Sequence, residues 1–403
     1  MEVAQKPDYI GKGSYGCAFK YKDPYFQCED SFDGDYKGKV IKGMTTKDAK
    51  DEYTKYNQFK DSDGKFPSSI LETKLCKMKK DQIDTFKQHC QATEVAKETK
   101  DDFSLLIIKD GGIDLTKFID FLFTEGNTNK RDIVINFWKN SFTLLLALDD
   151  FSCRNIIHGD IKANNILYDV DLQKFSIIDF SFTKNFRDFD PVKYYSYLLS
   201  PLECHLILMN GKFKEDFSED FILEGLKKKN KKIENYTQYK YLVSEIQKTE
   251  DISDKFNPDE INYDDYIKLE IDTNITARTY DSYDIGMSLM YVLARSYEYL
   301  DINFVNEMSK MLYSMFMPDP SKRAILTIEL YNKYNEILKL LDDSLRKPDD
   351  HYHEGGEDYS GKNKSLNKLN KINQRLKSNK TKKNKKNNYK KTKRNYSRIR
   401  KNK

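Results

Sequence analysis

A short segment of the sequence, residues 155–167, combines an acid, a lysine and an amide at close spacing. It reads Asn-Ile-Ile-His-Gly-Asp-Ile-Lys-Ala-Asn-Asn-Ile-Leu and places Asp160, Lys162 and Asn165 between apolar residues. A carboxylate can accept the proton of a hydroxyl, a lysine can stabilise charge on a transferring phosphoryl group, and an amide oxygen can bind a divalent metal ion. The three side chains therefore predict phosphoryl transfer to a hydroxyl group.

A further carboxylate, Asp179, follows a short apolar run that is typical of a buried strand, residues 174–178. Mg2+ prefers hard oxygen ligands such as carboxylates and amide oxygens. We expect Asp179 and Asn165 to bind Mg2+ or Mn2+. A simple turn residue at the end of a strand is the alternative, which the spacing from Asp160 disfavours.

A glycine-rich segment lies near the N-terminus. Glycine lets the backbone approach a phosphate closely, so that its amides can meet the negative charge. The alternation after this segment indicates a second strand rather than a helix, which disfavours a dinucleotide-binding turn. The residues expected to contact a nucleotide are Ile10, Gly11, Lys12, Gly13, Ser14, Tyr15, Gly16, Cys17 and Ala18.

The β-rich run 38–42 ends in Lys42, which could neutralise phosphate charge, whereas Lys39 lies on the opposite face of such a strand. A helix over about 47–60, capped by Thr45 or Thr46, would present Glu52 beside its apolar flank. We expect Glu52 to orient Lys42, and Glu72 is the alternative partner.

Taken in chain order, these motifs resemble those of eukaryotic-type protein kinases. The matches are to Gly-x-Gly-x-x-Gly, Val-Ala-Ile-Lys, His-Arg-Asp-x-Lys-x-x-Asn and Asp-Phe-Gly, with Gly159 and Ser181 as departures. Ser200-Pro-Leu-Glu203 resembles Ala-Pro-Glu, Arg323 resembles its buried ion-pair partner, and Asp281 to Gly286 resembles Asp-x-x-x-x-Gly at the start of an apolar helix.

The resemblance implies an α+β, bilobal protein-kinase-like fold with a small β-rich N-lobe and a larger helical C-lobe. The N-lobe would comprise residues 1–109 and the C-lobe 110–343, with an insertion at 204–280 that is long for the family. ATP would bind between the lobes, with its adenine at a hinge formed by residues 107–112.

The same resemblance implies a role for each residue. Asp160 would accept the proton of the substrate hydroxyl and Lys162 would stabilise the γ-phosphate, while Lys42 would contact the α- and β-phosphates. A lysine two residues after Asp160, together with Ser196, favours a serine/threonine kinase with a protein substrate.

Two other functions remain open. A small-molecule phosphotransferase of the aminoglycoside- or choline-kinase type shares His-Gly-Asp, but typically lacks a lysine at position 162. A pseudokinase scaffold is disfavoured because Lys42, Asp160, Asn165 and Asp179 are all intact. Gly159 stands where an arginine commonly pairs with a phosphorylated loop, which predicts activation without such phosphorylation.

Composition sets broader limits. The 403 residues and 47.5 kDa suffice for two lobes, and no apolar run approaches the roughly 18 residues of a transmembrane helix. The six cysteines show no paired spacing and are expected to be thiols in a reducing compartment, cytoplasmic or nuclear. The biased composition resembles that of kinases encoded by large DNA viruses. This resemblance would add host cytoplasm or a virion to the expected locations.

The C-terminal residues differ in charge from the rest. Residues 361–403 hold 19 Lys and Arg side chains and no Asp or Glu, whereas acidic side chains are in excess before them. We expect a linker followed by a disordered basic tail over 344–403, which would attract nucleic acid or another acidic surface. A purely solubilising tail is the alternative.

Overall fold

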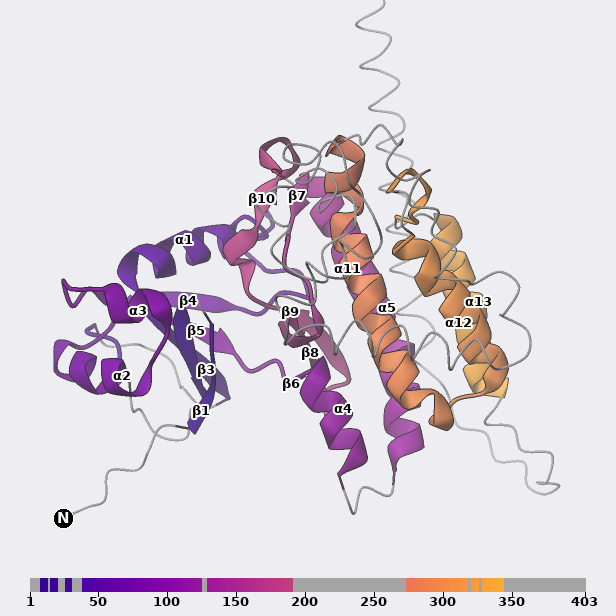
Figure 1. Ribbon diagram of the computed structural model, residues 1–403, viewed down its shortest axis with the longest axis horizontal. Helices are drawn as coiled ribbons and strands as arrows, with labels where there is room; N and C mark the ends of the chain where they lie inside the picture. Colours follow the sequence, from indigo (N-terminus) through magenta and orange to yellow (C-terminus); the bar gives the residue numbers. More distant parts are fainter. Residues whose placement is uncertain are drawn as a thin grey trace, which may run out of the picture. The chain divides into compact units, whose positions relative to one another are not determined.

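A small antiparallel β-sheet and a set of longer helices make up the described part of this computed structural model, which is of the mixed α+β class (Figure 1). The structure describes residues 8–13, 15–20, 26–30, 38–124, 129–190, 273–317, 320–325 and 328–343. Predictions that involve Ser14, Ser196, Ser200–Glu203, most of the insertion and the basic tail lie outside these residues.

The five-stranded sheet has the order β1-β2-β3-β5-β4, and all its pairings are antiparallel. Its strands are β1 (Asp8–Lys12), β2 (Gly16–Lys20), β3 (Lys39–Thr45), β4 (Thr73–Lys77) and β5 (Phe103–Lys109). Successive side chains of a strand point to opposite faces, so the register decides what each face holds. Ala18 pairs with Lys42, which pairs with Leu106, so these three side chains share one face, the inner face.

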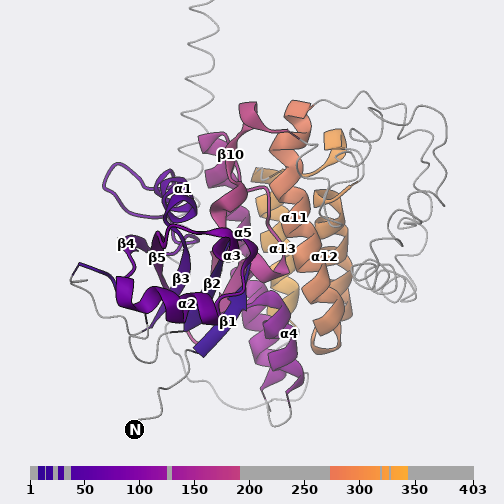
Figure 2. The same cartoon turned by 60° about the vertical axis from the view of Figure 1, so that its left-hand side comes forward.

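The outer face of the sheet is apolar and is covered by two short helices, α2 (Ile83–His89) and α3 (Thr93–Lys97), which Figure 2 shows beside the strands. Phe86 of α2 packs against Phe19, Phe26 and Phe103 with ring centroids 5.5–6.3 Å apart. Burial of large aromatic rings contributes strongly to stability, so this layer fixes the sheet from behind.

Two disulfides cross the same layer. Cys17 of β2 is bonded to Cys90 after α2, and Cys28 is bonded to Cys76 of β4. The prediction that these cysteines are thiols is therefore wrong. The partners lie 73 and 48 positions apart in the chain, and only strand pairing and the α2 segment bring them together. Disulfides persist in oxidising surroundings, so these two bonds do not support a reducing compartment.

The inner face of the sheet packs against α1 (Thr46–Asn57). Thr45 caps this helix, since its side-chain oxygen accepts a hydrogen bond from the Asp48 amide at 3.2 Å. The expected helix is thus present, with its C-terminus three residues earlier than predicted. Ala49, Glu52 and Tyr56 are buried on one side of α1, as their spacing indicated.

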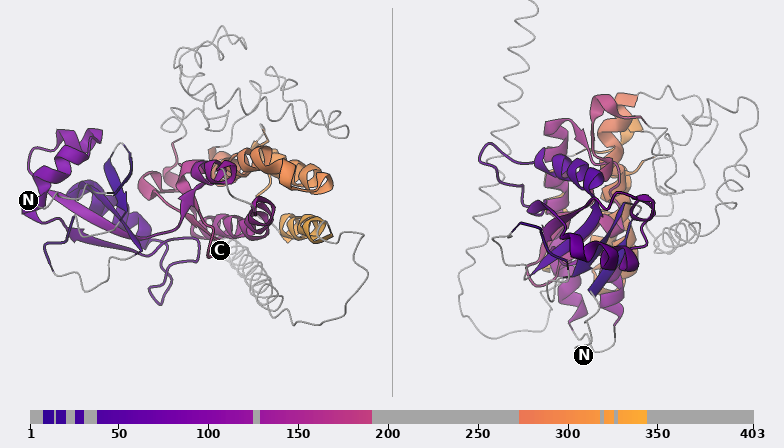
Figure 3. Two further views of the ribbon diagram at one scale, coloured as in Figure 1. Left: turned by 90° about the horizontal axis from the view of Figure 1, so that it is seen from below. Right: turned by 90° about the vertical axis from the view of Figure 1, so that its left-hand side faces the viewer.

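The helical region consists of long helices that pack along one another (Figures 1 and 3). They are α4 (Leu115–Phe123), α5 (Lys130–Arg154), α11 (Thr273–Ser296), α12 (Ile302–Met315) and α13 (Ile328–Asp343). Their core centres on the fully buried Trp138, whose ring lies 5.4 Å from Phe137 and 5.7 Å from Phe304. No helix within the described ranges is long and apolar enough to cross a membrane.

Short strands beside these helices carry the loops of interest. β6 (Ile113–Asp114), β8 (Ile166–Asp169) and β9 (Lys174–Ile177) form one small sheet, and β7 (Ile156–Ile157) pairs with β10 (Lys184–Asn185). The 3-10 turns are Lys80–Gln82, Ala163–Asn165, Phe180–Phe182, Phe186–Asp188, Tyr297–Tyr299 and Pro320–Lys322. Asp281 does not open its helix as expected, because α11 begins at Thr273 and Asp281 lies inside it.

Candidate functional site

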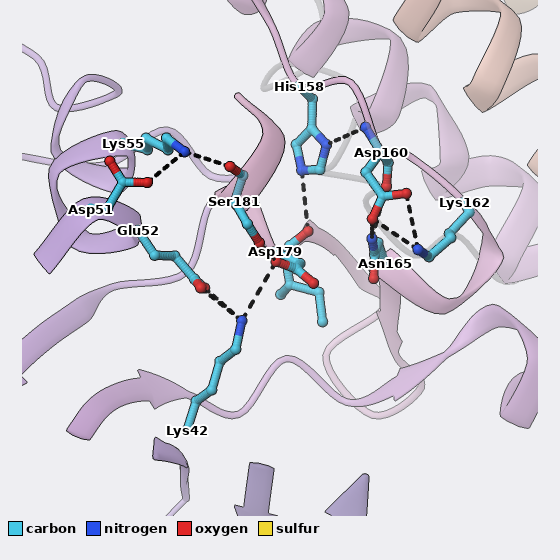
Figure 4. Close-up of polar contacts among 11 residues, drawn as sticks. Lys42, Asp51, Glu52, Lys55, His158, Asp160, Lys162, Asn165, Asp179 and Ser181 are labelled. Atoms are coloured by element: carbon cyan, nitrogen blue, oxygen red, sulfur yellow. Dashed lines mark hydrogen bonds and ion pairs between the residues drawn. The ribbon is translucent and has the colours of Figure 1, made fainter. Parts of the chain in front are cut away.

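Lys42 joins α1 to the segment after β9 (Figure 4). Its Nζ donates to both carboxylate oxygens of Glu52, at 2.9 and 2.8 Å, and lies 3.5 Å from Oδ1 of Asp179. Of the two glutamates considered from the sequence, the structure pairs Glu52 with Lys42. Glu72 instead precedes β4, where its carbonyl oxygen accepts a hydrogen bond from the Lys109 amide.

The charges of this group are interdependent. Burial alone would lower the pKa of Lys42, but the carboxylates of Asp179 and Glu52 outweigh it and raise that pKa above its usual range. Burial works to raise the pKa of Asp179, yet Lys42 and the Ser181 hydroxyl lower it to about 2. Asp179 therefore keeps its negative charge at neutral pH, as a metal ligand would require.

The loop between β7 and β8 assembles Asp160, Lys162 and Asn165. The Nζ of Lys162 donates to both oxygens of Asp160, at 2.9 and 2.8 Å. The amide nitrogen of Asn165 donates to the backbone oxygen of Asp160 at 2.8 Å and to its Oδ2 at 3.0 Å. Because the side-chain nitrogen of Asn165 makes both bonds, its side-chain oxygen is the atom that would be available to a cation.

The Asp160 carboxyl is buried, which raises its pKa, while Lys162 and Asn165 oppose this shift. A carboxylate with a raised pKa is a better proton acceptor than a fully solvated one. The loop thus combines a base with two groups that hold its orientation.

His158 and Asp281 fix the position of this loop. The Asp281 carboxylate accepts hydrogen bonds from the amides of His158 at 2.7 Å and Gly159 at 3.0 Å. Gly159 adopts a φ of +77°, a backbone conformation that side chains rarely tolerate, so glycine suits this position. Burial lowers the pKa of His158 to about 4, and the neutral ring bridges the Ile178 carbonyl and the Asp160 amide.

An aromatic cluster connects α1 to the same loop. The Phe180 ring lies 4.5 Å from Tyr56, 4.9 Å from Phe59 and 4.7 Å from His158, measured between centroids. All four side chains are almost fully buried. Phe180 therefore packs in a closed apolar space, and this packing sets the position of its neighbour Asp179.

Sequence reasoning missed two polar contacts on this segment. Lys55 of α1 donates to the backbone oxygen of Ser181, and the Ser181 hydroxyl donates to Oδ1 of Asp179 (Figure 4). Ser181 had been noted only as a replacement for glycine. The one sequence signal for Lys55 is its place three residues after Glu52, on the same side of a helix.

The glycine-rich segment forms the turn between β1 and β2, where the Gly13 amide donates to the Gly16 oxygen at 2.9 Å. A Cβ atom at Gly16 would lie 2.4 Å from the Gly43 oxygen, so only glycine lets β2 approach β3 this closely. The Cys17 side chain lies on the outer face in the bond to Cys90. Only its backbone remains for a nucleotide.

The backbone at the end of β5 is largely occupied. The amides of Lys109, Asp110 and Gly112 donate to the Glu72 oxygen, the Gly38 oxygen and the Asp110 side chain, at 2.9–3.1 Å. Of the residues expected to form a hinge, 107–109 belong to β5, and Asp110–Gly112 form the turn between β5 and β6. A base bound here would meet carbonyl oxygens or the Gly111 amide.

Arg323 is buried and lies over the ring of Tyr283, 4.7 Å from its centroid. Its Nε donates to the Met317 oxygen at 2.6 Å. The expected partner, Glu203, lies outside the described residues.

Asp179 and Asn165 are the two residues whose side chains could hold Mg2+ through oxygen atoms. No group of three His, Cys, Asp or Glu side chains that could hold a metal exists among the described residues. Mg2+ is usually bound by one or two carboxylates together with substrate phosphates and water, so Asp179 and the Asn165 oxygen fit this ion. The chain matches no protein-family model and no curated protein sequence.

Proposed function

We propose that this chain is an ATP-dependent serine/threonine protein kinase with a bilobal protein-kinase-like fold. The observation that carries the proposal is the convergence of two groups from distant parts of the sequence. Lys42 contacts both Glu52 and Asp179, while Asp160, Lys162 and Asn165 form one hydrogen-bonded unit beside them. Phosphoryl transfer needs a nucleotide clamp, metal ligands and a base, and these residues supply all three.

The nucleotide would be held by the sheet region. Lys42 would neutralise the α- and β-phosphates. The β1–β2 turn would cover these phosphates, because β2 pairs with β3, the strand that carries Lys42. Asp179 and Asn165 would bind Mg2+ or Mn2+, which supplies charge neutralisation on the phosphates when bound. The adenine would lie at the Asp110–Gly112 turn, against carbonyl oxygens and the Gly111 amide.

The acceptor hydroxyl would be activated by the helical region. Asp160 would take its proton, and Lys162, 2.8 Å from Asp160 Oδ2, would stabilise charge on the γ-phosphate. A lysine at this place favours a protein hydroxyl over a small alcohol, which is why we rank the small-molecule phosphotransferase second.

The test is transfer of labelled phosphate from ATP with Mg2+ to a panel of casein, histone, a basic protein, an aminoglycoside and choline. Asp160→Asn keeps the shape of the side chain but removes the base, and we expect it to lower the rate at least a hundredfold. Asp171→Asn, an exposed residue in the β8–β9 turn, is the matched control and should retain full activity.

Phosphoamino-acid analysis separates the candidates. Label on serine or threonine that disappears in Asp160→Asn supports the proposal. Label found only on aminoglycosides or choline would support the second candidate, and a chain that binds no nucleotide would leave a scaffold.

A further inference from the structure

Helix α1 holds the segment after β9 at two points on one side of the helix. Glu52 reaches Asp179 through Lys42, and three residues later Lys55 donates to the backbone oxygen of Ser181. Lys55 is only 17% exposed and forms an ion pair with Asp51 at 2.8 Å. The carboxylate of Asp51, on the same helix, therefore helps to hold the Lys55 ammonium in place against Ser181.

Ser181 completes the arrangement on the other side. Its hydroxyl donates to Oδ1 of Asp179, and Nζ of Lys42 lies 3.5 Å from the same oxygen. Both contacts fall on Oδ1, so Oδ2 would be the oxygen available to a metal ion. A glycine at 181 would provide no hydroxyl and would leave the orientation of this carboxylate to Lys42 alone.

The backbone of Asp179 makes such support necessary. Asp179 has φ +65° and ψ 72°, in the left-handed region that non-glycine residues seldom occupy. A conformation of this kind persists only when surrounding contacts fix it. Contacts that hold this segment include the packing of Phe180 against Tyr56 and the ion pair between Lys42 and Asp179. Ser181 adds two hydrogen bonds, one accepted from Lys55 and one donated to Asp179.

We propose that Lys55 and Ser181 are positioning residues that set the metal-binding carboxylate of Asp179 and couple it to the position of α1. This inference deepens the proposed function and rests on it. It also offers a reason for glycine at position 159. Because α1 itself holds the segment after β9, ordering that segment would require neither a phosphorylated loop nor an arginine at 159.

The test measures metal binding as well as activity. Full-length protein is titrated with Mn2+ at a fixed concentration of the fluorescent analogue trinitrophenyl-ATP, and the Mn2+ concentration at half-maximal binding is recorded. We expect Ser181→Ala to raise this concentration about tenfold, because one hydrogen bond to a charged group is lost. Ser181→Thr keeps the hydroxyl and should restore the wild-type value.

Lys55 is tested in the same titration. Lys55→Met keeps the aliphatic part of the side chain and removes the charge, and we expect a rise of about tenfold. Lys50→Met, an exposed lysine on the same helix, is the matched control and should match the wild type. Melting temperatures are recorded for every variant, so that a general loss of folding is recognised as such.

The outcomes separate the two proposals. If wild-type protein binds the analogue and transfers phosphate, but Ser181→Ala and Lys55→Met have the Mn2+ midpoints of the wild type, the positioning roles are wrong and the kinase proposal stands. If the variants shift the midpoint while the wild type transfers no phosphate, the positioning roles stand and the kinase proposal fails. Wild-type protein that binds no nucleotide at any Mn2+ concentration overturns both.

Discussion

The two faces of the five-stranded sheet are stabilised in different ways, one by burial of apolar side chains and the other by pairing of charges. The outer face buries aromatic side chains under α2 and α3 and is crossed by two disulfides. The inner face places Lys42 beside two carboxylates and gains stability there only if every charge is paired. The outer face therefore supplies the rigidity on which the strained, charged arrangement of the inner face depends.

Removing the cation of the inner face should have the largest effect. Lys42→Met leaves Glu52 and Asp179 close together without a positive charge, so we expect the free energy of unfolding to fall by roughly 3–5 kcal/mol. Phosphate transfer should fall at least about a hundredfold. Urea denaturation and the labelled-ATP assay measure the two effects, and unchanged stability would mean that the pair is not buried in solution.

The double variant Cys17→Ser with Cys90→Ser removes one of the two disulfides that cross the outer face. Loss of a disulfide that closes a long loop should lower the free energy of unfolding by about 4 kcal/mol. Urea denaturation with and without dithiothreitol measures this loss of free energy. The reductant should destabilise the wild type by breaking both disulfides, whereas the variant has only the Cys28–Cys76 bond to lose. Identical wild-type curves under both conditions would contradict the pairing.

His158 extends the comparison to the helical region, because it is buried as a neutral group in the loop after β7. Its pKa is lowered to about 4 in the folded chain from 6.5, so the unfolded chain binds more protons between these values. His158 therefore stabilises the fold above pH 6.5, and this contribution is lost as the pH falls through 4.

The difference in unfolding free energy between wild type and His158→Phe should shrink by about 3 kcal/mol over that interval. Asp281, whose pKa burial raises to about 7, shifts stability in the opposite sense, but it is present in both proteins and largely cancels. Parallel pH profiles for the two proteins would show that His158 titrates normally.

Gly16 tests the contact between β2 and β3. Gly16→Ala would place a Cβ atom 2.4 Å from the Gly43 oxygen, so the strands must separate, at a cost of roughly 2 kcal/mol. Gly11→Ala meets no atom within 4 Å and is the matched control. Thermal melting compares them, and equal melting temperatures would contradict the close approach.

Much of the site could be predicted from local sequence. Asp160, Lys162 and Asn165 lie within six residues, so a single loop can bring them together, although Asp281 from a distant helix fixes that loop. Strand alternation placed Lys42 and Lys39 on opposite faces, and helical spacing placed Glu52 on the buried side of α1. The end of β5 at Lys109 could not be predicted, because the backbone hydrogen bonds there are made to Glu72 and Gly38, which are distant in the chain.

The sequence by itself determined the chemistry of this protein: which side chains are acids, bases and amides, and the period of the elements that carry them. The tertiary structure decided which of them meet. Cys17 faces Cys90, and Lys55 reaches Ser181 across 126 positions, because register and helix packing act over distances that no local pattern encodes. Periodicity fixes which face a residue occupies, whereas only packing fixes what that face touches.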